Sequence, residues 1–477
     1  MSKNSKILLT SILALAFLIR VLGISYALPQ EFISDEFLMV AASLKMLDEG
    51  TLRPYFGDIF YHQPLSAYIS LGGIGTYLGW EMFAEKFTSL KAMADYYTSN
   101  HAANARELLI VTRFLAVLFG AATVYLMYLI GRDLFSSRVG FISAFFAASE
   151  LLLIETNHTG RVWSFLVFFI ALSFWASVRV LRRGSFKDYI FSAIASSLAL
   201  ATLMPGILSF FSSLIPNFSL RGKKIWTAFL ILFSAVLISV YLNPRGLGVI
   251  FLRFGEHSSI GASRVDWLHK FIDPFATLFN FMPVYVLLFF AALFILYKTD
   301  FKKFLLIASF PVAYYLFIGP LFSYGNVERA LTPFAPYIII GAAFAADRFF
   351  DRIWSKHLFP ASILVLALYS IFFSILFDIK ISRPDTRIEA IGWMKNILES
   401  EKPNYYSRYI WGNESPDQFD AAEKDFKSKE LVARLSPVQD PAKLKNNFFN
   451  NIQNPARVLW NVDRFGPTVE IYRVQLK

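Results

Sequence analysis

The sequence has no cysteine among its 477 residues, and charged side chains make up only 17% of it. The missing thiols exclude disulfides, thiolate metal sites and a cysteine nucleophile. An average soluble domain has about 25% charged residues, because it needs polar surface to cover its core. Since 56% of the residues are hydrophobic, the composition excludes a soluble globular enzyme, a disordered chain and a fibrous repeat protein.

Long unbroken apolar runs are what the chain has instead, and they exclude an outer-membrane barrel, whose strands alternate. A membrane-spanning helix needs about 20 apolar residues. Runs of this kind lie at 7–28, 108–131, 139–154, 162–181, 225–242, 279–297, 304–322, 330–346 and 358–377. The segment 189–216 is long for one span and short for two, and Pro205-Gly206 interrupts it near the middle.

The distribution of charge decides how often 189–216 crosses the membrane. Lys and Arg cluster in short loops at 3–6, 132–138, 179–187, 221–224, 298–303 and 348–356. All these loops face the cytoplasm, as the positive-inside rule requires, only if 189–216 crosses twice with a hinge at Pro205. We therefore predict an all-α polytopic membrane protein of about 11 transmembrane helices with a cytoplasmic N-terminus.

The opposite, extracytoplasmic face then holds a first loop at 29–107, a second at 243–278 and a polar tail at 378–477. The tail pattern predicts helices at 385–400, 417–430 and 441–449, and strands at 405–411, 456–461 and 468–474. We therefore expect two domains, a membrane domain over 1–377 and a small α/β domain over 378–477.

Two adjacent carboxylates, Asp35 and Glu36, follow the first apolar run. They point in different directions on a helix, so they are not a paired acid–base dyad. One of them could face a cavity at membrane level while the other fixes the loop. Taken alone, the pair is more typical of a helix start, with Ser34 as the cap.

The order of motifs around this pair is more specific. An amphipathic stretch from Phe37 follows, then a Gly-Pro turn, then Tyr61-His62-Gln63-Pro64-Leu65 before another apolar run. This order resembles the first luminal or periplasmic loop of GT-C glycosyltransferases. The closest likeness is to family 39, the protein O-mannosyltransferases, and to the related lipid A aminoarabinose transferases. Segments that begin at Arg113 and at Glu328-Arg329 resemble later parts of the same family, so the likeness covers roughly residues 7–350.

The resemblance implies a GT-C fold and an inverting transfer of a sugar from a polyprenyl-phosphate donor. The acceptor hydroxyl, on protein, lipid or glycan, would lie on the extracytoplasmic face, with Asp35 as general base and Glu36 beside it. A phosphate leaving group needs cations rather than a strong acid, which favours arginines on that side. The candidate donor- or acceptor-binding residues are Tyr61, His62, Arg113, His158, Arg161, Glu328 and Arg329. Arg161 could equally snorkel at a helix end, and Glu328 could simply pair with Arg329.

Other features limit this interpretation. No His spacing marks a metal site, so we expect no metal or other cofactor. The tail is nearly neutral despite the net charge of +11, which excludes a nucleic-acid partner. Met204 stands where the family often has Lys, and no Asp follows Arg161. These departures leave the identity of the sugar donor open.

A transporter or flippase and a non-catalytic scaffold remain alternative functions. The lack of cysteine and of a retention signal favours a prokaryotic plasma membrane.

Overall fold

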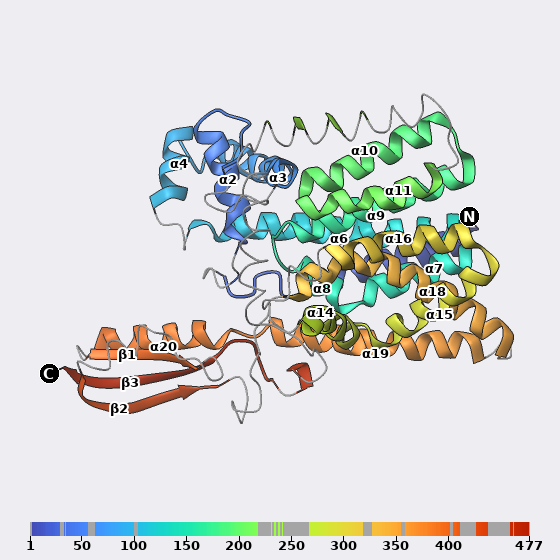
Figure 1. Ribbon diagram of the computed structural model, residues 1–477. Coiled ribbons are helices and arrows are strands. Elements are labelled where there is room, and N and C mark those ends of the chain that lie inside the picture. The colour runs from blue at the N-terminus through green and yellow to red at the C-terminus, as the bar shows by residue number, and fades with distance from the viewer. Residues whose placement is uncertain are drawn as a thin grey trace.

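The computed structural model describes residues 2–28, 33, 35–55, 63–99, 104–217, 230, 233–234, 237–238, 241, 267–317, 327–353, 358–400, 404–410, 426–436, 458–460 and 462–476. Helices dominate, and the long ones run roughly alongside one another in a bundle (Figure 1). The N-terminus lies at one end of this bundle. The C-terminal sheet lies beyond the opposite end, so the two parts of the chain are separated along the bundle axis.

Most bundle helices coincide with predicted apolar runs, but α14 lies largely in the stretch expected as the second external loop, and the run at 139–154 is divided between α7 and α8. Their bounds are α1 (Lys3–Val21), α6 (Arg106–Leu134), α7 (Ser137–Ser149), α8 (Leu151–Asn157), α9 (Trp163–Arg183), α10 (Phe186–Thr202), α11 (Ser209–Asn217), α14 (Trp267–Phe281), α15 (Pro283–Thr299), α16 (Phe301–Phe317), α17 (Val327–Leu331), α18 (Ala335–Ile353) and α19 (Leu358–Ile381). The run at 225–242 lies almost entirely outside the described residues. By length and composition, four described helices could cross a membrane, or up to six if each bent pair is one span.

The break predicted at Pro205 is present. A 3₁₀ turn, η1 (Met204–Leu208), separates α10 from α11, and both helices pack against α9. Gly206 is needed in this turn, because an added Cβ would lie 2.0 Å from the carbonyl oxygen of Ala199. Hydroxyl hydrogen bonds join the three helices inside the apolar bundle, through Ser173, Ser177, Ser192, Ser196 and Ser213.

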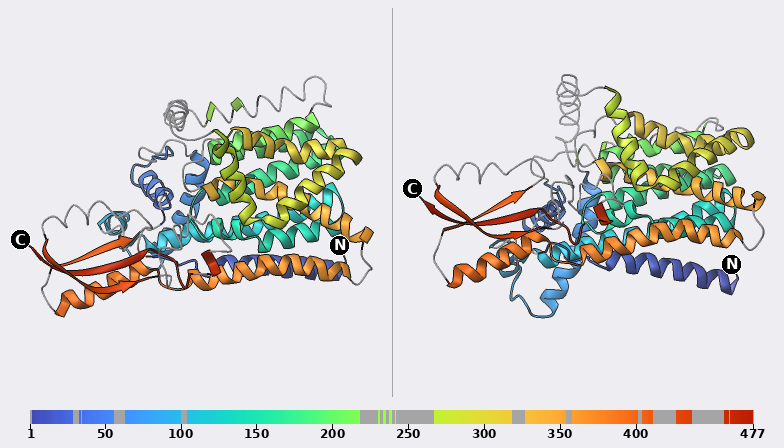
Figure 2. Two further views of the ribbon diagram at one scale, coloured as in Figure 1. Left: turned by 60° about the horizontal axis from the view of Figure 1, so that its bottom comes forward. Right: turned by 90° about the horizontal axis from the view of Figure 1, so that it is seen from below.

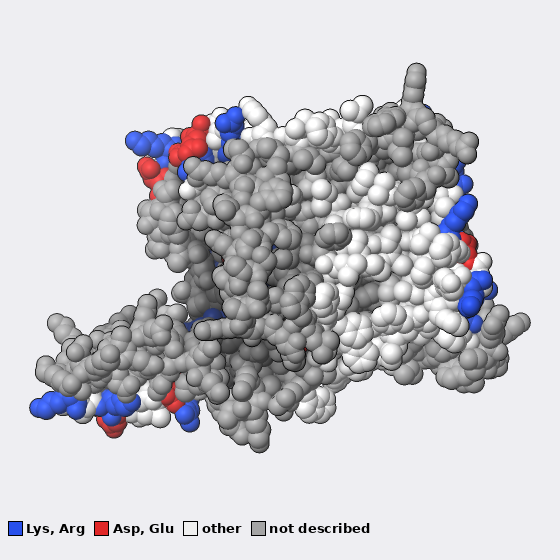
Figure 3. All heavy atoms as spheres, viewed as in Figure 1, with Lys and Arg blue, Asp and Glu red and all other residues white. Residues whose placement is uncertain are grey.

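Basic turns gather at the end of the bundle that holds the N-terminus. Arg182, in the last turn of α9, pairs with Asp133, in the last turn of α6, at 3.0 Å. The ammonium of Lys303 lies 5.5 Å from the ring centroid of Phe135, and Arg138 pairs with α18 through Asp347. On the face shown in Figure 3, uncharged residues cover the middle of the bundle and charged ones lie toward the ends. This distribution is typical of a membrane-embedded bundle.

A sharp bend of 56° separates α7 from α8. The Arg20 guanidinium donates to the carbonyl oxygens of Ala147 and Ala148 in the last turn of α7. At the start of α8, the Glu150 carboxylate accepts hydrogen bonds from two amides of the first turn, those of Leu152 and Leu153. Helix ends leave such backbone groups unpaired, and in an apolar bundle each unpaired group is costly. These two charged side chains therefore stabilise the bend.

Three further helices belong to the first loop: α2 (Phe37–Asp48), α3 (Pro64–Phe83) and α4 (Leu90–Ser99). The helix predicted from Phe37 is thus present. Pro64 occupies the first turn of α3, where a missing amide hydrogen costs nothing.

The C-terminal module combines α20 (Thr386–Ser400) with strands β1 (Asn404–Ile410), β2 (Phe426–Leu435) and β3 (Thr468–Leu476). The strand order is β1-β3-β2, and β3 pairs antiparallel with both neighbours. One face of the sheet packs against α20 through Ala390, Val469 and Ile471. In Figure 2, α19 runs along the bundle and is followed by α20, which lies in this module.

Two predictions for the tail are wrong. The helix expected at 417–430 is contradicted by β2, because pairing with β3 overrides the helical propensity of the Lys, Glu and Ala residues there. The strand expected at 456–461 is a helical turn at 458–460. Val458 and Leu459 are buried in the main bundle core, so this apolar run packs on helices rather than in the sheet. The expected helix at 441–449 lies outside the described residues.

We expect Arg20→Met to lower the free energy of unfolding by about 2–4 kcal/mol, because it removes the donors that satisfy the end of α7. Thermal unfolding in detergent measures this change. Arg182→Met, at a guanidinium 53% exposed, serves as the control and should change stability by less than about 1 kcal/mol. Equal effects of the two substitutions would contradict the proposed role of Arg20.

Candidate functional site

A fully enclosed ion pair joins the first loop to the bundle. Arg113 Nε lies 2.6 Å from Glu36 Oε1, and Nη2 lies 2.7 Å from Oε2, so the contact is bidentate. The Arg113 and Glu36 side chains are 1% and 4% exposed. The remaining guanidinium nitrogen of Arg113 donates to the carbonyl oxygens of Ile24 and Tyr26, in the chain that leaves α1. All three guanidinium nitrogens of Arg113 thus have partners within the protein.

The same carboxylate holds a second segment. The Gly160 amide, in the turn between α8 and α9, donates to Glu36 Oε1 at 2.7 Å. A Cβ at Gly160 would lie 2.4 Å from the hydroxyl oxygen of Thr112, so only glycine allows this turn to approach α6 so closely. Because Asp35 precedes Glu36 and Arg161 follows Gly160, the Glu36 carboxylate positions both neighbours.

Asp35 lies outside this enclosed pair. Its Oδ2 is 3.5 Å from Nη1 of Arg329, and the two side chains are 21% and 22% exposed. Its φ is +66°, a left-handed conformation that Asp tolerates better than most residues. The helix-capping interpretation of the acidic pair is wrong, because α2 begins at Phe37 and Glu36 makes no capping hydrogen bond. Ser34 lies outside the described residues.

Two arginines and two glutamates line one cavity, and one of these arginines, Arg329, contacts Asp35. Its walls are Leu152, Glu155, Thr156, Thr159, Arg161, Trp163, Glu328 and Arg329. Burial, together with the neighbouring Arg329, lowers the pKa of Arg161 to about 10, so its guanidinium remains charged at neutral pH. Among the described residues, no three side chains of metal-ligating type lie together.

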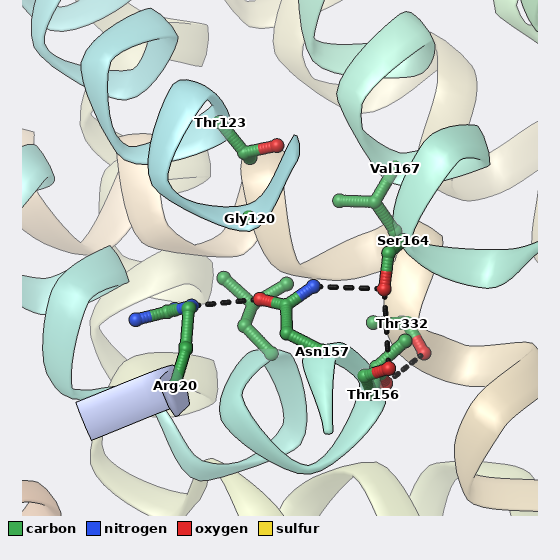
Figure 4. A pocket seen from close by; sticks show the side chains of 9 residues that line it. Arg20, Gly120, Thr123, Thr156, Asn157, Ser164, Val167 and Thr332 are labelled. Atoms are coloured by element: carbon green, nitrogen blue, oxygen red, sulfur yellow. Dashed lines mark hydrogen bonds between the residues drawn. The ribbon is translucent and has the colours of Figure 1, made fainter. Parts of the chain in front are cut away.

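Figure 4 shows a neighbouring pocket, around which hydrogen bonds connect Arg20 to Thr156, a residue that also lines the cavity. Arg20 donates to Asn157, Asn157 to Ser164, and Ser164 to the Thr156 carbonyl oxygen, at 2.7, 2.9 and 3.1 Å. The Thr156 and Thr332 hydroxyls are 3.3 Å apart, and that of Thr332 donates to the Arg329 carbonyl oxygen at 2.6 Å. The Thr332 hydroxyl thus satisfies a backbone carbonyl near the end of α17, the helix that carries Arg329.

His158 does not reach the cavity. Its ring nitrogens lie 2.8 Å from the Ile154 carbonyl oxygen and 2.6 Å from that of Leu22, and it is 1% exposed. The structure therefore places His158 between α8 and the end of α1. Tyr61 and His62 lie outside the described residues.

The C-terminal module contacts the same loop. The Tyr26 hydroxyl donates to Asp385 Oδ2 at 2.7 Å, and Arg387 binds both oxygens of that carboxylate. The Tyr26 ring also packs edge-on against Phe465, with centroids 6.0 Å apart. Since the Tyr26 carbonyl accepts from Arg113, Tyr26 and Arg113 connect the module to Glu36.

Sequence reasoning missed Glu155, Trp163 and the roles of Arg20 and Asn157. Glu155 directly follows the apolar run at 139–154. An ionisable residue at the end of such a run is a signal that could have identified it. The partners of Arg20 lie more than 100 positions away along the chain, so local spacing could not reveal them.

Comparison with known families bears on this site. Residues 104–244 match the family model described as dolichyl-phosphate-mannose-protein mannosyltransferase. The resemblance drawn from the motifs is thereby confirmed. This match covers 141 of the 477 residues, and over that stretch the chain is similar to membrane glycosyltransferases. No curated protein sequence matches it.

Solved structures show that this chain has the fold of that group. ArnT from Cupriavidus metallidurans bound to undecaprenyl phosphate superposes with a TM-score of 0.51 at 13% identity, covering 84% of this chain and 73% of that one. The apo oligosaccharyltransferase of Archaeoglobus fulgidus gives 0.51 at 14% identity, covering 89% of this chain and 60% of that one. The chain is an integral membrane protein with several apolar helices.

Breaking the enclosed pair should destabilise the protein strongly. We expect Glu36→Gln or Arg113→Gln alone to lower the free energy of unfolding by about 3–5 kcal/mol, because each leaves a buried group unpaired. The double variant should cost less than the sum of the two by at least about 1 kcal/mol. Denaturation in detergent measures all three variants, and simple additivity would show that the two side chains do not act together.

Proposed function

We propose that this glycosyltransferase moves a sugar from a polyprenyl-phosphate donor to an acceptor hydroxyl, with inversion at the anomeric carbon. The acceptor oxygen bonds to that carbon as the bond to the phosphate oxygen breaks. The hydroxyl proton passes to the Asp35 carboxylate, and polyprenyl phosphate leaves with the bonding electrons. The observation that carries the proposal is the pairing of Asp35 with Arg329, at a cavity that also holds Arg161.

Asp35 suits the base because it is the carboxylate left accessible. Glu36 is enclosed and accepts three hydrogen bonds, so it has no free access to an acceptor. We assign Glu36 and Arg113 to positioning rather than to catalysis or donor binding. His158, buried between carbonyl oxygens, has the same kind of role.

Arg161 and Arg329 suit the donor phosphate, since guanidinium groups bind phosphate oxygens and stabilise the charge that develops on the leaving group. The bond between Thr332 and the Arg329 carbonyl holds one of them in place. A bound phosphate competes with Asp35 for Arg329, which frees the carboxylate for the acceptor hydroxyl. The donor lipid is of the class bound in the ArnT structure.

The distribution of basic residues supports a sidedness for the reaction. The basic turns lie at the N-terminal end of the bundle, and by the positive-inside rule this end faces the cytoplasm. The cavity and the module beyond residue 377 then lie on the extracytoplasmic side. We place the protein in a prokaryotic plasma membrane.

We expect Asp35→Asn to lower turnover by about 100- to 10,000-fold, because the amide cannot accept the hydroxyl proton. The measurement is release of undecaprenyl phosphate from undecaprenyl-phosphate sugars by the purified protein. Asp48→Asn, at an exposed position at the end of α2, should leave the rate unchanged. Undiminished turnover in Asp35→Asn would remove Asp35 from the mechanism.

Arg329→Gln should weaken binding of undecaprenyl phosphate by about 10- to 100-fold, because it removes a charge-assisted hydrogen bond to phosphate. Native mass spectrometry in detergent measures the affinity. Arg106→Gln, at the exposed start of α6, is the matched loss of a guanidinium outside the cavity. If both variants bind the lipid as the wild type does, Arg329 is not a phosphate ligand.

A further inference from the structure

Two buried glutamates of the cavity have no role in the reaction described so far. Glu155 of α8 and Glu328 of α17 are 5% and 2% exposed, and both line the cavity with Arg161 and Arg329. One carboxylate oxygen of Glu155 and both of Glu328 have no hydrogen-bond partner among the described residues. Buried polar atoms without partners are costly. Their presence here points to a ligand that forms hydrogen bonds with these carboxyl oxygens.

The chemistry of these atoms restricts that ligand. Whichever form it takes, each carboxyl group has at least one oxygen that can only accept a hydrogen bond, so a ligand that pairs with this oxygen must donate. A phosphate diester carries no donor, and it is attracted to the two arginines rather than to acids. The group beside the glutamates is therefore a different part of the donor molecule, one that is rich in hydroxyls.

The rest of the wall fits such a group. Trp163, 6% exposed at the first position of α9, contributes an aromatic surface, and Thr156 and Thr159 contribute hydroxyls. An apolar or aromatic wall with a few fixed polar groups is the usual composition of a small-molecule site.

We propose that Glu155 and Glu328 bind the hydroxyl groups of the transferred sugar, beside the arginines that bind its phosphate. This inference rests on the proposed function, because it places the sugar next to the phosphate site. It assigns to Glu155 a specificity-determining role, since a ring without the matching hydroxyl leaves a buried carboxylate unpaired. Sites built on such hydrogen bonds reject the deoxy analogue strongly.

The test compares a lipid with and without its sugar. Native mass spectrometry measures the affinity for undecaprenyl phosphate and for undecaprenyl phosphate linked to mannose, glucose or galactose. With the wild type, at least one glycosylated lipid should bind about tenfold more tightly than undecaprenyl phosphate. Glu155→Gln and Glu328→Gln should each abolish most of this gain and leave the affinity for undecaprenyl phosphate unchanged.

Glu150→Gln is the matched control. Its carboxylate is equally buried and lies five positions from Glu155, but both of its oxygens accept backbone amides. This substitution should lower the thermal stability without changing the ratio of the two affinities.

The remaining outcomes distinguish failure of the sugar site from failure of the proposed function. If the wild type binds undecaprenyl phosphate but no sugar improves binding, the sugar site is wrong and the donor class stands. If Glu155→Gln weakens both lipids equally, or neither, Glu155 does not contact the sugar. If the wild type binds none of the lipids, the proposed function fails and the sugar site fails with it.

Discussion

The bidentate contact between Arg113 and Glu36 is the interaction on which the site depends. It joins the chain leaving α1, the first loop, α6 and the turn before α9. A buried ion pair offsets its loss of hydration only when every donor and acceptor is in place. Such a contact has one low-energy geometry, and it imposes that geometry on its neighbours in the chain. Asp35 and Arg161 are each one residue from a member of this network, so their separation is set by it.

The bundle follows the same rule, because its buried polar groups are also paired with one another. The Arg20 guanidinium and the Glu150 carboxylate satisfy the backbone at the bend between α7 and α8, and buried serines join α9, α10 and α11. In an apolar medium such groups have no water as an alternative partner. Most polar side chains of the described bundle interior thus have a partner, and the glutamates of the cavity are among the few whose hydrogen-bonding capacity is partly unused.

The sequence was sufficient for features set by local composition. Apolar runs predicted the helices, Pro205 predicted the break before α11, and the motifs predicted the glycosyltransferase group. It was insufficient where distant segments compete. β2 has helix-forming residues but pairs with β3, and Arg113 was expected at the donor but binds Glu36, 77 positions away. Local spacing also could not assign the members of the acidic pair, of which Glu36 binds Arg113 and Asp35 contacts Arg329.

The strand order β1-β3-β2 has a consequence for how the module forms during synthesis. β3 is the central strand, yet it emerges from the ribosome after both of its neighbours. β1 and β2 therefore wait with unpaired edges until residues 468–476 are available, and such edges are prone to pairing with other chains. Because Phe465, just before β3, packs on Tyr26, the first loop also acquires this support late. Assembly of the site is thus coupled to the progress of translation.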